Sequence, residues 1–92
     1  DVKGNSYLIE GNTGYNTQPS VLKDGYQINC AVDGWGRYNI FKNNTCNVNA
    51  AGHGFNVRLK SSKGEAVGNL IYDNNIVKGA ASGVANIPLI NK

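Results

Sequence analysis

The chain repeats one sequence pattern three times. The segments YLIEGNTGY, YNIFKNNTC and NLIYDNNIV begin at positions 7, 38 and 69, and align without gaps. The aligned positions are Ile9, Ile40 and Ile71, together with Asn12, Asn43 and Asn74. Self-similarity at a period of about 30 residues is typical of repeat architectures, in which each unit stacks on the next.

A second series has a slightly shorter period and begins at Gly25, Gly54 and Gly83. Side chains alternate after each of these glycines, in the patterns YQINC, FNVRL and VANIP. Alternation with a period of two indicates strands. Asn and Gly, which most easily adopt φ > 0, fill the segments between the strands. Each repeat therefore contains at least two short strands joined by turns.

A unit of about 30 residues made of short strands cannot bury its own apolar face, so we expect the units to stack about 4.8 Å apart. The predicted fold is all-β, a parallel β-helix (β-solenoid) of three coils, forming one domain over residues 1–92 with coils at about 5–36, 37–67 and 68–92. Stacking predicts three ladders, in which equivalent side chains of successive coils lie one above another. Two ladders face inward and consist of Ile9, Ile40 and Ile71, and of Tyr26, Phe55 and Val84. The third lies at a turn and consists of Asn12, Asn43 and Asn74. Because Ile40 lies in the middle coil, we expect its truncation to cost far more than that of Lys42.

Two sets of segments resemble known β-helix proteins. The stretch NIFKNN (39–44), its copy around 71–75, and Gly-x-Gly-Phe-x-Val (52–57) resemble the right-handed parallel β-helix proteins of the pectate-lyase-like class. The stretches DGWGRYNIF, GHGFNV and GVANIPLI are similar to the last coils of secreted microbial β-helix repeat proteins of the NosD type. The resemblance implies a right-handed solenoid and a secreted location. It implies no single activity, because the class includes lyases, hydrolases, epimerases, adhesins and structural proteins.

Composition and charge exclude several classes of protein. With 15 Asn, 12 Gly and 16% charged residues, a helical bundle is excluded. Since 40% of the residues are apolar, disorder is not expected, and no apolar run reaches the roughly 20 residues of a membrane span. The net charge of +3 is spread along the chain, which argues against nucleic acid as a partner.

Cys30 and Cys46 are the only cysteines, and two are too few for a zinc site. Both fall at positions that we expect to face inward. The sequence leaves three alternatives open, namely an intrachain disulfide, two buried free thiols, or an interchain bond.

A candidate carbohydrate site comprises Trp35, Arg37, His53 and Arg58. Trp35 lies between two glycines and could stack on a sugar ring, while Arg37 and the outward-pointing Arg58 could bind an acidic polysaccharide. His53 would lie one coil from Asp24, which makes it the best acid–base candidate. The alternatives are that Trp35 packs against the solenoid or a neighbouring molecule, and that the polar side chains are simply solvated.

No catalytic residue, metal site or cofactor is predicted. No nucleophile or second base accompanies His53. The acidic residues fall at different repeat positions, so no calcium cluster can be recognised. They are Glu10, Asp24, Asp33, Glu65 and Asp73.

Three coils are only about 14 Å tall, so both ends expose unpaired backbone and apolar ladder. The sequence contains no recognisable capping segment. The leading prediction is therefore a secreted structural subunit whose coils stack head-to-tail on copies of itself, forming a filament, or onto a longer β-helix. The alternative is a polysaccharide-binding or polysaccharide-lyase-type β-helix, so the sequence leaves open whether the chain is an enzyme.

Overall fold

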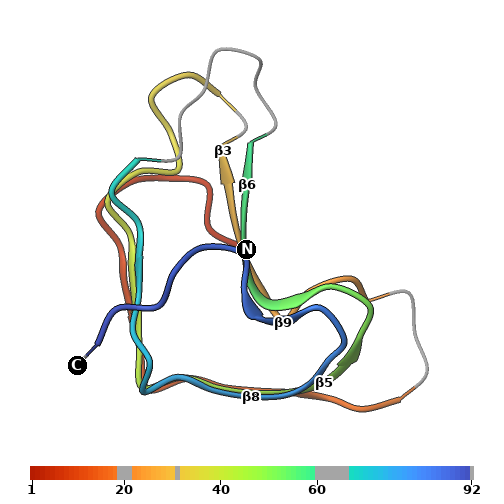
Figure 1. Cartoon of the computed structure of the whole chain (residues 1–92). Coiled ribbons are helices and arrows are strands. Elements are labelled where there is room, and N and C mark those ends of the chain that lie inside the picture. The colour runs from red at the N-terminus through yellow and green to blue at the C-terminus, as the bar shows by residue number, and fades with distance from the viewer. Residues whose placement is uncertain (19–21, 31, 60–66, 92) are drawn as a thin grey trace.

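The computed structural model describes residues 1–18, 22–30, 32–59 and 67–91, which form nine short strands and no helix (Figure 1). Sheet 1 contains β1 (Leu8–Glu10), β4 (Ile40–Lys42) and β7 (Leu70–Ile71). Sheet 2 contains β2 (Thr13–Asn16), β5 (Thr45–Ala50) and β8 (Ile76–Ala80). Sheet 3 contains β3 (Tyr26–Cys30), β6 (His53–Leu59) and β9 (Gly83–Ala85).

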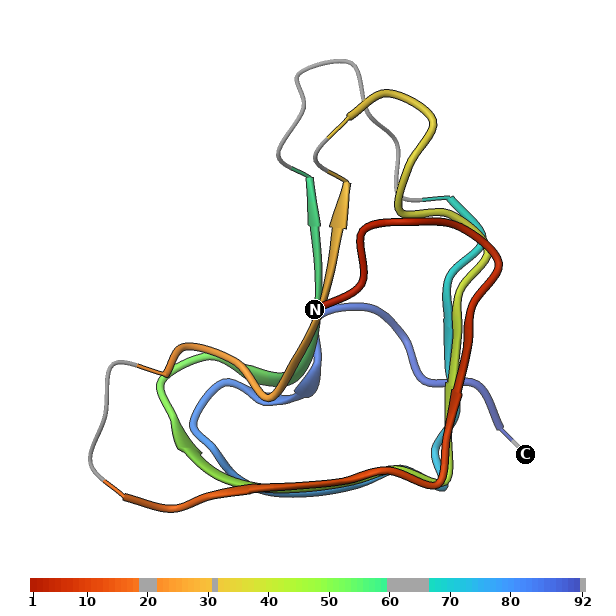
Figure 2. The same ribbon diagram turned by 180° about the vertical axis from the view of Figure 1, so that it is seen from behind.

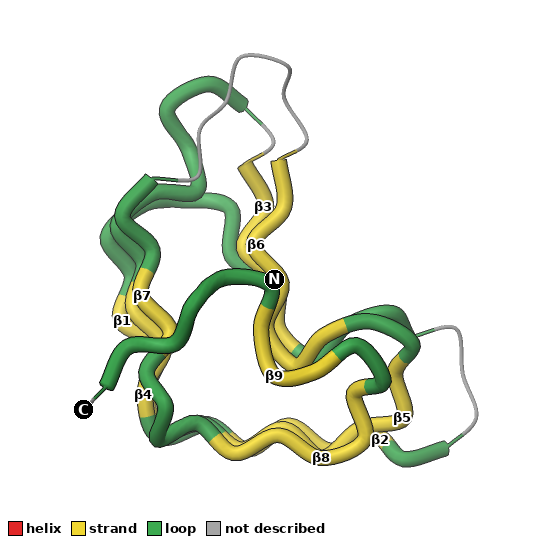
Figure 3. Tube along the Cα trace, viewed as in Figure 1, coloured by secondary structure: helices red, strands yellow, loops and turns green. Residues whose placement is uncertain are grey.

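The chain visits the three sheets in the same order three times, and every strand pair is parallel. The coils superimpose when the molecule is viewed along the solenoid axis, with the last coil nearest the viewer in Figure 1 and the first coil nearest in Figure 2. Figure 3 shows the three sheets as separate sides of this outline. The predicted all-β solenoid of three coils, with a repeat of about 30 residues, is confirmed.

Isolated parallel bridges extend two of the sheets by one layer. Val2 pairs with Ile28 beside β3, and Ile90 pairs with Tyr72 beside β7. Sheets 1 and 3 therefore each have four layers in the described chain, whereas sheet 2 has three strands.

The predicted isoleucine ladder is wrong by one residue in the middle coil. Ile9 lies opposite Phe41, and Phe41 lies opposite Ile71, whereas Ile40 pairs with Leu8 and Leu70 on the outward side. The step along the chain from Ile9 to Phe41 is longer than the step from Phe41 to Ile71, and the regular sequence period hides this difference. A slip of one residue moves a side chain to the opposite face of a strand.

The apolar core lies between the sheets and is aromatic at its centre. Phe41, Phe55, Ile28 and Ile71 are each at most 1% exposed. The Tyr26 and Phe55 rings stack with their centroids 4.9 Å apart, which confirms that part of the second predicted ladder.

The third member of that ladder is Ala85, not Val84 as predicted. The reason is again a change of spacing, because the step from Phe55 to Ala85 is one residue longer than the step from Tyr26 to Phe55. Val84 still packs against the core from a half-buried position.

The amide ladder between sheets 1 and 2 is formed by Asn12, Asn44 and Asn75. The backbone N–H and the side-chain Nδ2 of Asn12 both donate to Asn44 Oδ1, at 3.0 and 3.1 Å. Asn44 donates to Asn75 Oδ1 in the same way, at 2.9 and 3.1 Å. The amide oxygens of Asn44 and Asn75 thus each accept two hydrogen bonds from the preceding coil.

The prediction that Asn12 stacks on Asn43 is therefore wrong, because the strand register aligns Asn43 with Gly11. Both of these residues have positive φ, 72° for Gly11 and 55° for Asn43, as the turn requires. The predicted pairing of Asn43 with Asn74 is confirmed, since Asn74 Nδ2 donates to Asn43 Oδ1 at 2.7 Å, on the exposed side of the turn.

A further amide pair precedes sheet 1. Asn39 donates through its backbone N–H and its Nδ2 to Asn69 Oδ1, at 3.0 and 3.1 Å, and its own Oδ1 accepts the Tyr7 N–H at 3.0 Å. Asn39 and Asn44 are both 0% exposed. A buried amide must have hydrogen-bond partners, so these residues determine which position of one coil lies on which position of the next.

Both cysteines are buried free thiols, so the intrachain disulfide, one of the alternatives that the sequence left open, is not formed. They lie on different elements, Cys30 at the end of β3 and Cys46 within β5, where it packs with Val48 and Ala50. Burial raises the pKa of the Cys46 thiol. Within one chain, the structure therefore has the ordinary core thiols.

The corrected register predicts which truncation is most destructive. Phe41→Ala should lower the free energy of unfolding by about 3 to 5 kcal/mol, because a fully buried ring leaves a cavity. Ile40→Ala should cost only about 1 kcal/mol and Lys42→Ala less than about 0.5, since these side chains face outward. Denaturant titration of the three variants measures this order. Equal losses for Phe41→Ala and Ile40→Ala would contradict the register.

Candidate functional site

The four residues of the predicted carbohydrate site lie in two parts of the molecule. Trp35 borders a cavity at the first coil, whereas His53 and Arg58 belong to β6 in sheet 3. Arg37 follows the Trp35 loop, and its backbone N–H donates to Asn5 Oδ1 at 2.8 Å. Arg37, His53 and Arg58 do not line the cavity.

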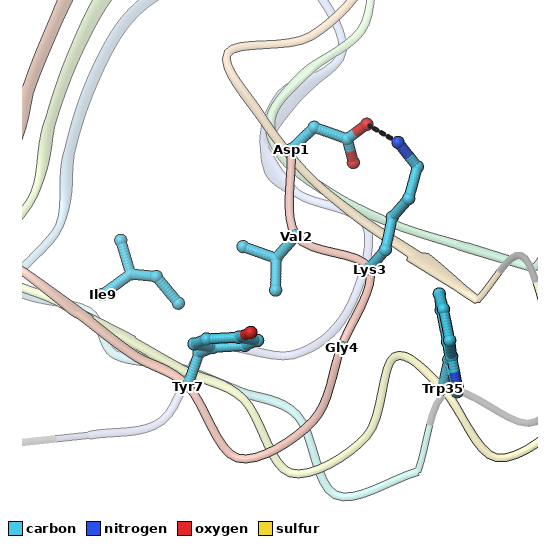
Figure 4. A pocket seen from close by; sticks show the side chains of 7 residues that line it. All are labelled: Asp1, Val2, Lys3, Gly4, Tyr7, Ile9 and Trp35. Atoms are coloured by element: carbon cyan, nitrogen blue, oxygen red, sulfur yellow. Dashed lines mark ion pairs between the residues drawn. The ribbon is translucent and has the colours of Figure 1, made fainter.

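This cavity, called the end cavity below, opens at the first coil and has a volume of about 530 Å³ (Figure 4). It is lined by Asp1, Val2, Lys3, Gly4, Tyr7, Ile9 and Trp35. Val2 and Ile9 provide aliphatic walls, and Tyr7 and Trp35 provide aromatic ones, which are 56% and 47% exposed. A volume of about 300 to 1,000 Å³ is the size of a typical ligand pocket.

Backbone pairing of residues 1–3 forms one wall of the end cavity. The Val2 N–H donates to the Gln27 carbonyl at 2.8 Å, and the Asn29 N–H donates to the Val2 carbonyl at 2.8 Å. These bonds hold Val2 above β3, where it packs against the core.

The segment 32–37, which lies between β3 and β4, brings Trp35 to the same cavity. The Gly36 N–H donates to the Gly4 carbonyl at 3.1 Å, and the Trp35 N–H donates to the Val32 carbonyl at 3.1 Å. Gly36 has a φ of 78°, and a Cβ there would lie 3.0 Å from the Cα of Cys30. Only glycine fits such a position easily, which explains why a glycine follows Trp35.

An ion pair in the cavity wall joins Lys3 Nζ to Asp1 Oδ2 at 3.1 Å. Both side chains are about half exposed, so this pair contributes little to stability. Apart from this ion pair, the side chains that line the end cavity are aliphatic or aromatic. The cavity therefore suits an apolar or aromatic group.

The opposite end of the solenoid also exposes aliphatic side chains. Leu89 is 41% exposed and Ile90 is 37% exposed. Because Ile90 bridges Tyr72, Leu89 lies beside Ile71, at the inward position of the next layer of sheet 1. Ile87 is half-buried against the core.

Asp24 is a buried carboxylate with several hydrogen-bond partners. It is 3% exposed and accepts the His53 N–H at 2.8 Å, Gln27 Nε2 at 2.7 Å and Asn56 Nδ2 at 3.2 Å. The expected proximity of Asp24 and His53 is confirmed, but through the His53 backbone rather than its imidazole. A Cβ on Gly52 would collide with Asp24 Oδ1, so a glycine is required beside this carboxylate.

Burial by itself raises the pKa of Asp24, but its hydrogen bonds and the positive charge of Arg58 together outweigh burial and hold the pKa below the ordinary value. The carboxylate is thus ionised at neutral pH, with three donors already bound. This arrangement suits a structural role that joins two coils better than proton transfer.

A row of amides and a guanidinium follows Asp24 along β3 and β6. Arg58 Nη1 donates to Gln27 Oε1 at 3.5 Å, and Asn29 Nδ2 donates to the same oxygen at 3.2 Å and also to the Asp1 carboxylate. Asn29 is 3% exposed, and its Oδ1 is buried without a hydrogen-bond partner. Sequence reasoning found only Arg58 of this row, although the alternation along β3 already placed Gln27 and Asn29 together.

Candidate metal ligands are scattered in the described part of the chain. There, no three His, Cys, Asp or Glu residues lie close enough together to hold a metal ion, while Glu65 lies outside the described residues. No helix of the described chain is long and apolar enough to cross a membrane. Comparison with protein-family models, curated proteins and solved structures finds no match.

The Asp24 network predicts acid-sensitive stability. Because the folded-state pKa is lowered, Asp24 stabilises the fold above its unfolded pKa of about 3.9, and this stability is lost as pH falls through the folded pKa. Asp24→Asn should lose about 1 to 3 kcal/mol at pH 7, and the difference from wild type should shrink as the pH falls through the folded-state pKa of Asp24. The exposed Glu10, which pairs with Lys42, is the matched control, and Glu10→Gln should change stability by less than about 0.5 kcal/mol. A difference for Asp24→Asn that persists undiminished at low pH would contradict this account.

Proposed function

We propose that the chain is a structural β-solenoid unit that assembles head-to-tail through its two ends, onto copies of itself or onto a longer β-helix. One observation carries the proposal. The inward apolar layers are open at both ends, with Val2 and Ile9 lining the end cavity at the first coil and Leu89 exposed at the last.

The backbone edges support the same conclusion. In the described chain, β1 is the outer strand of sheet 1 at the first coil, and β9 is the outer strand of sheet 3 at the last. Each outer strand has backbone groups that can pair with a further strand. All pairs within the solenoid are parallel, so a head-to-tail copy continues the existing hydrogen-bond pattern.

The size of the ends is compatible with a stable contact. The molecule measures 34 × 30 Å across the two longer axes and 19 Å along the third. An end face therefore offers at most about 1,000 Å², compared with about 800 Å² per partner in a standard interface. A head-to-tail contact does not close on itself, so repeated addition gives a filament. A secreted location is part of the proposal and rests only on the resemblance to secreted β-helix proteins.

The row of Gln27, Asn29, Asn56 and Arg58 supports a second candidate function, the binding of an acidic polysaccharide on the side of the solenoid. Planar amides and a guanidinium bind hydroxyl and carboxylate groups well.

Head-to-tail assembly predicts that dilution changes both size and fluorescence. Trp35 is the only Trp and lines the end cavity, so its emission should shift to shorter wavelength as assembly buries it. Sedimentation velocity over a concentration series should show species larger than the monomer at the same concentrations. Free tryptophan amide at matched concentrations controls for optical artefacts. A single monomeric species up to millimolar concentration would refute the assembly.

The second candidate is tested by titrating the chain with oligogalacturonate while amide NMR shifts are recorded. We expect shifts at Gln27, Asn29 and Arg58, and Arg58→Ala should weaken binding by about tenfold, because it removes a charge-assisted contact. Lys78, exposed on β8, is the matched control, and Lys78→Ala should leave affinity unchanged. Shifts confined to other residues, or equal losses in both variants, would refute a site on this row.

A further inference from the structure

We infer that the end cavity of one copy is the socket for Leu89 and Ile87 of a second copy. This inference rests on the proposed head-to-tail assembly and adds which side chains make the contact. It follows from two columns of inward side chains that run the full height of the solenoid.

The first column belongs to sheet 1. Ile9 lies opposite Phe41, and Phe41 lies opposite Ile71. The Ile90 N–H donates to the Ile71 carbonyl at 2.9 Å, which sets Leu89 beside Ile71 as the last member of the column. This column therefore begins at a wall of the end cavity and ends on an exposed leucine.

The second column belongs to sheet 3. Val2 bridges Ile28, and Ile28 lies opposite Val57. Ile87 follows β9 and packs against the same core cluster as these residues. This column also begins at the end cavity, with Val2, and ends on a half-buried aliphatic side chain.

Both columns are thus aliphatic at both ends, and a head-to-tail copy continues them. Leu89 would lie over Ile9 and Ile87 over Val2, one layer spacing of about 4.8 Å away. Sheets 1 and 3 are the sheets that reach a fourth layer, so they meet first in such a contact and sheet 2 does not obstruct it.

The shape of the two ends selects this pairing over its alternatives. A head-to-head contact would place one end cavity against another and leave a large void between apolar walls, which forfeits packing contacts. A contact between two last coils would leave both cavities open to water. Only the head-to-tail contact puts aliphatic side chains into an apolar cavity.

Complementary variants test the inference. Tyr7 is 56% exposed at the end cavity, and Leu89 is 41% exposed at the other end. Tyr7→Glu blocks the socket, and Leu89→Glu blocks the side chains that fill it, called the plug here. Each variant should weaken self-association at least tenfold, because each introduces a charge into the contact. An equimolar mixture should form a 1:1 heterodimer that does not grow, since one intact socket and one intact plug remain.

Matched controls use the same chemical change on the outer strands of sheet 2. Tyr15 on β2 and Ile76 on β8 are 72% and 54% exposed, and neither lies on a column. Tyr15→Glu and Ile76→Glu should assemble within about threefold of wild type. Thermal unfolding followed by circular dichroism verifies that all four variants are folded.

Fluorescence identifies which socket is filled. If the socket-blocked variant also carries Trp35→Phe, the only indole in the mixture belongs to the Leu89→Glu copy, and its emission should shift when the heterodimer forms. Sedimentation of Leu89→Glu alone as a dimer would overturn the inference in favour of head-to-head contact. Wild-type-like assembly of both single variants would overturn it while leaving assembly itself intact. A monomeric wild type would instead refute the proposed function.

Discussion

The hydrogen bonds of stacked asparagine amides are the interaction on which the rest of the structure depends. Asn44 Oδ1 accepts two donors from the first coil, and Asn44 in turn donates twice to Asn75. Asn39 makes the same arrangement with Asn69. Because the amides of the middle coil are fully buried, a coil displaced by one residue would leave them unsatisfied, which is costly. The amides therefore set the register, and the register decides which side chains face inward.

That register has a consequence at the ends of the solenoid. Inward side chains form continuous columns. The side chain at the end of a column has a neighbour on one side only, so each terminal layer exposes apolar surface. At the first coil this surface is hollow, with Ile9 and Val2 lining the end cavity. At the last coil it carries Leu89, which is exposed. The side of the solenoid differs, because Asp24 there is already bound by three donors. The proposed assembly therefore rests on the inward apolar side chains that the two ends expose.

Much of the fold could be predicted from the repeat. The period of about 30 residues and the alternation after the glycines predicted a parallel solenoid of three coils, the stacking of Tyr26 on Phe55, and the proximity of Asp24 to His53. The errors share one cause. The number of residues between paired positions of neighbouring strands is not constant within a sheet. Ile40 therefore aligned with Ile9 in the sequence, although Phe41 takes that place in the core. An alignment matches residues of similar type. Burial depends instead on whether a residue occupies an inward-facing or an outward-facing position of its strand.

The candidate sites could be predicted less well, and the reason is physical. Composition and repeat determined by themselves that the chain forms short stacked strands with Asn and Gly at the turns. Only the tertiary structure decided that Trp35 lines the same cavity as Val2 and Tyr7, because the Gly36–Gly4 hydrogen bond joins segments that are distant in the sequence. Likewise the sequence placed Leu89 in an apolar run near the end of the chain, but only the bridge between Tyr72 and Ile90 set it beside Ile71. Local periodicity specifies strands, while a cavity depends on which loops fold back over them.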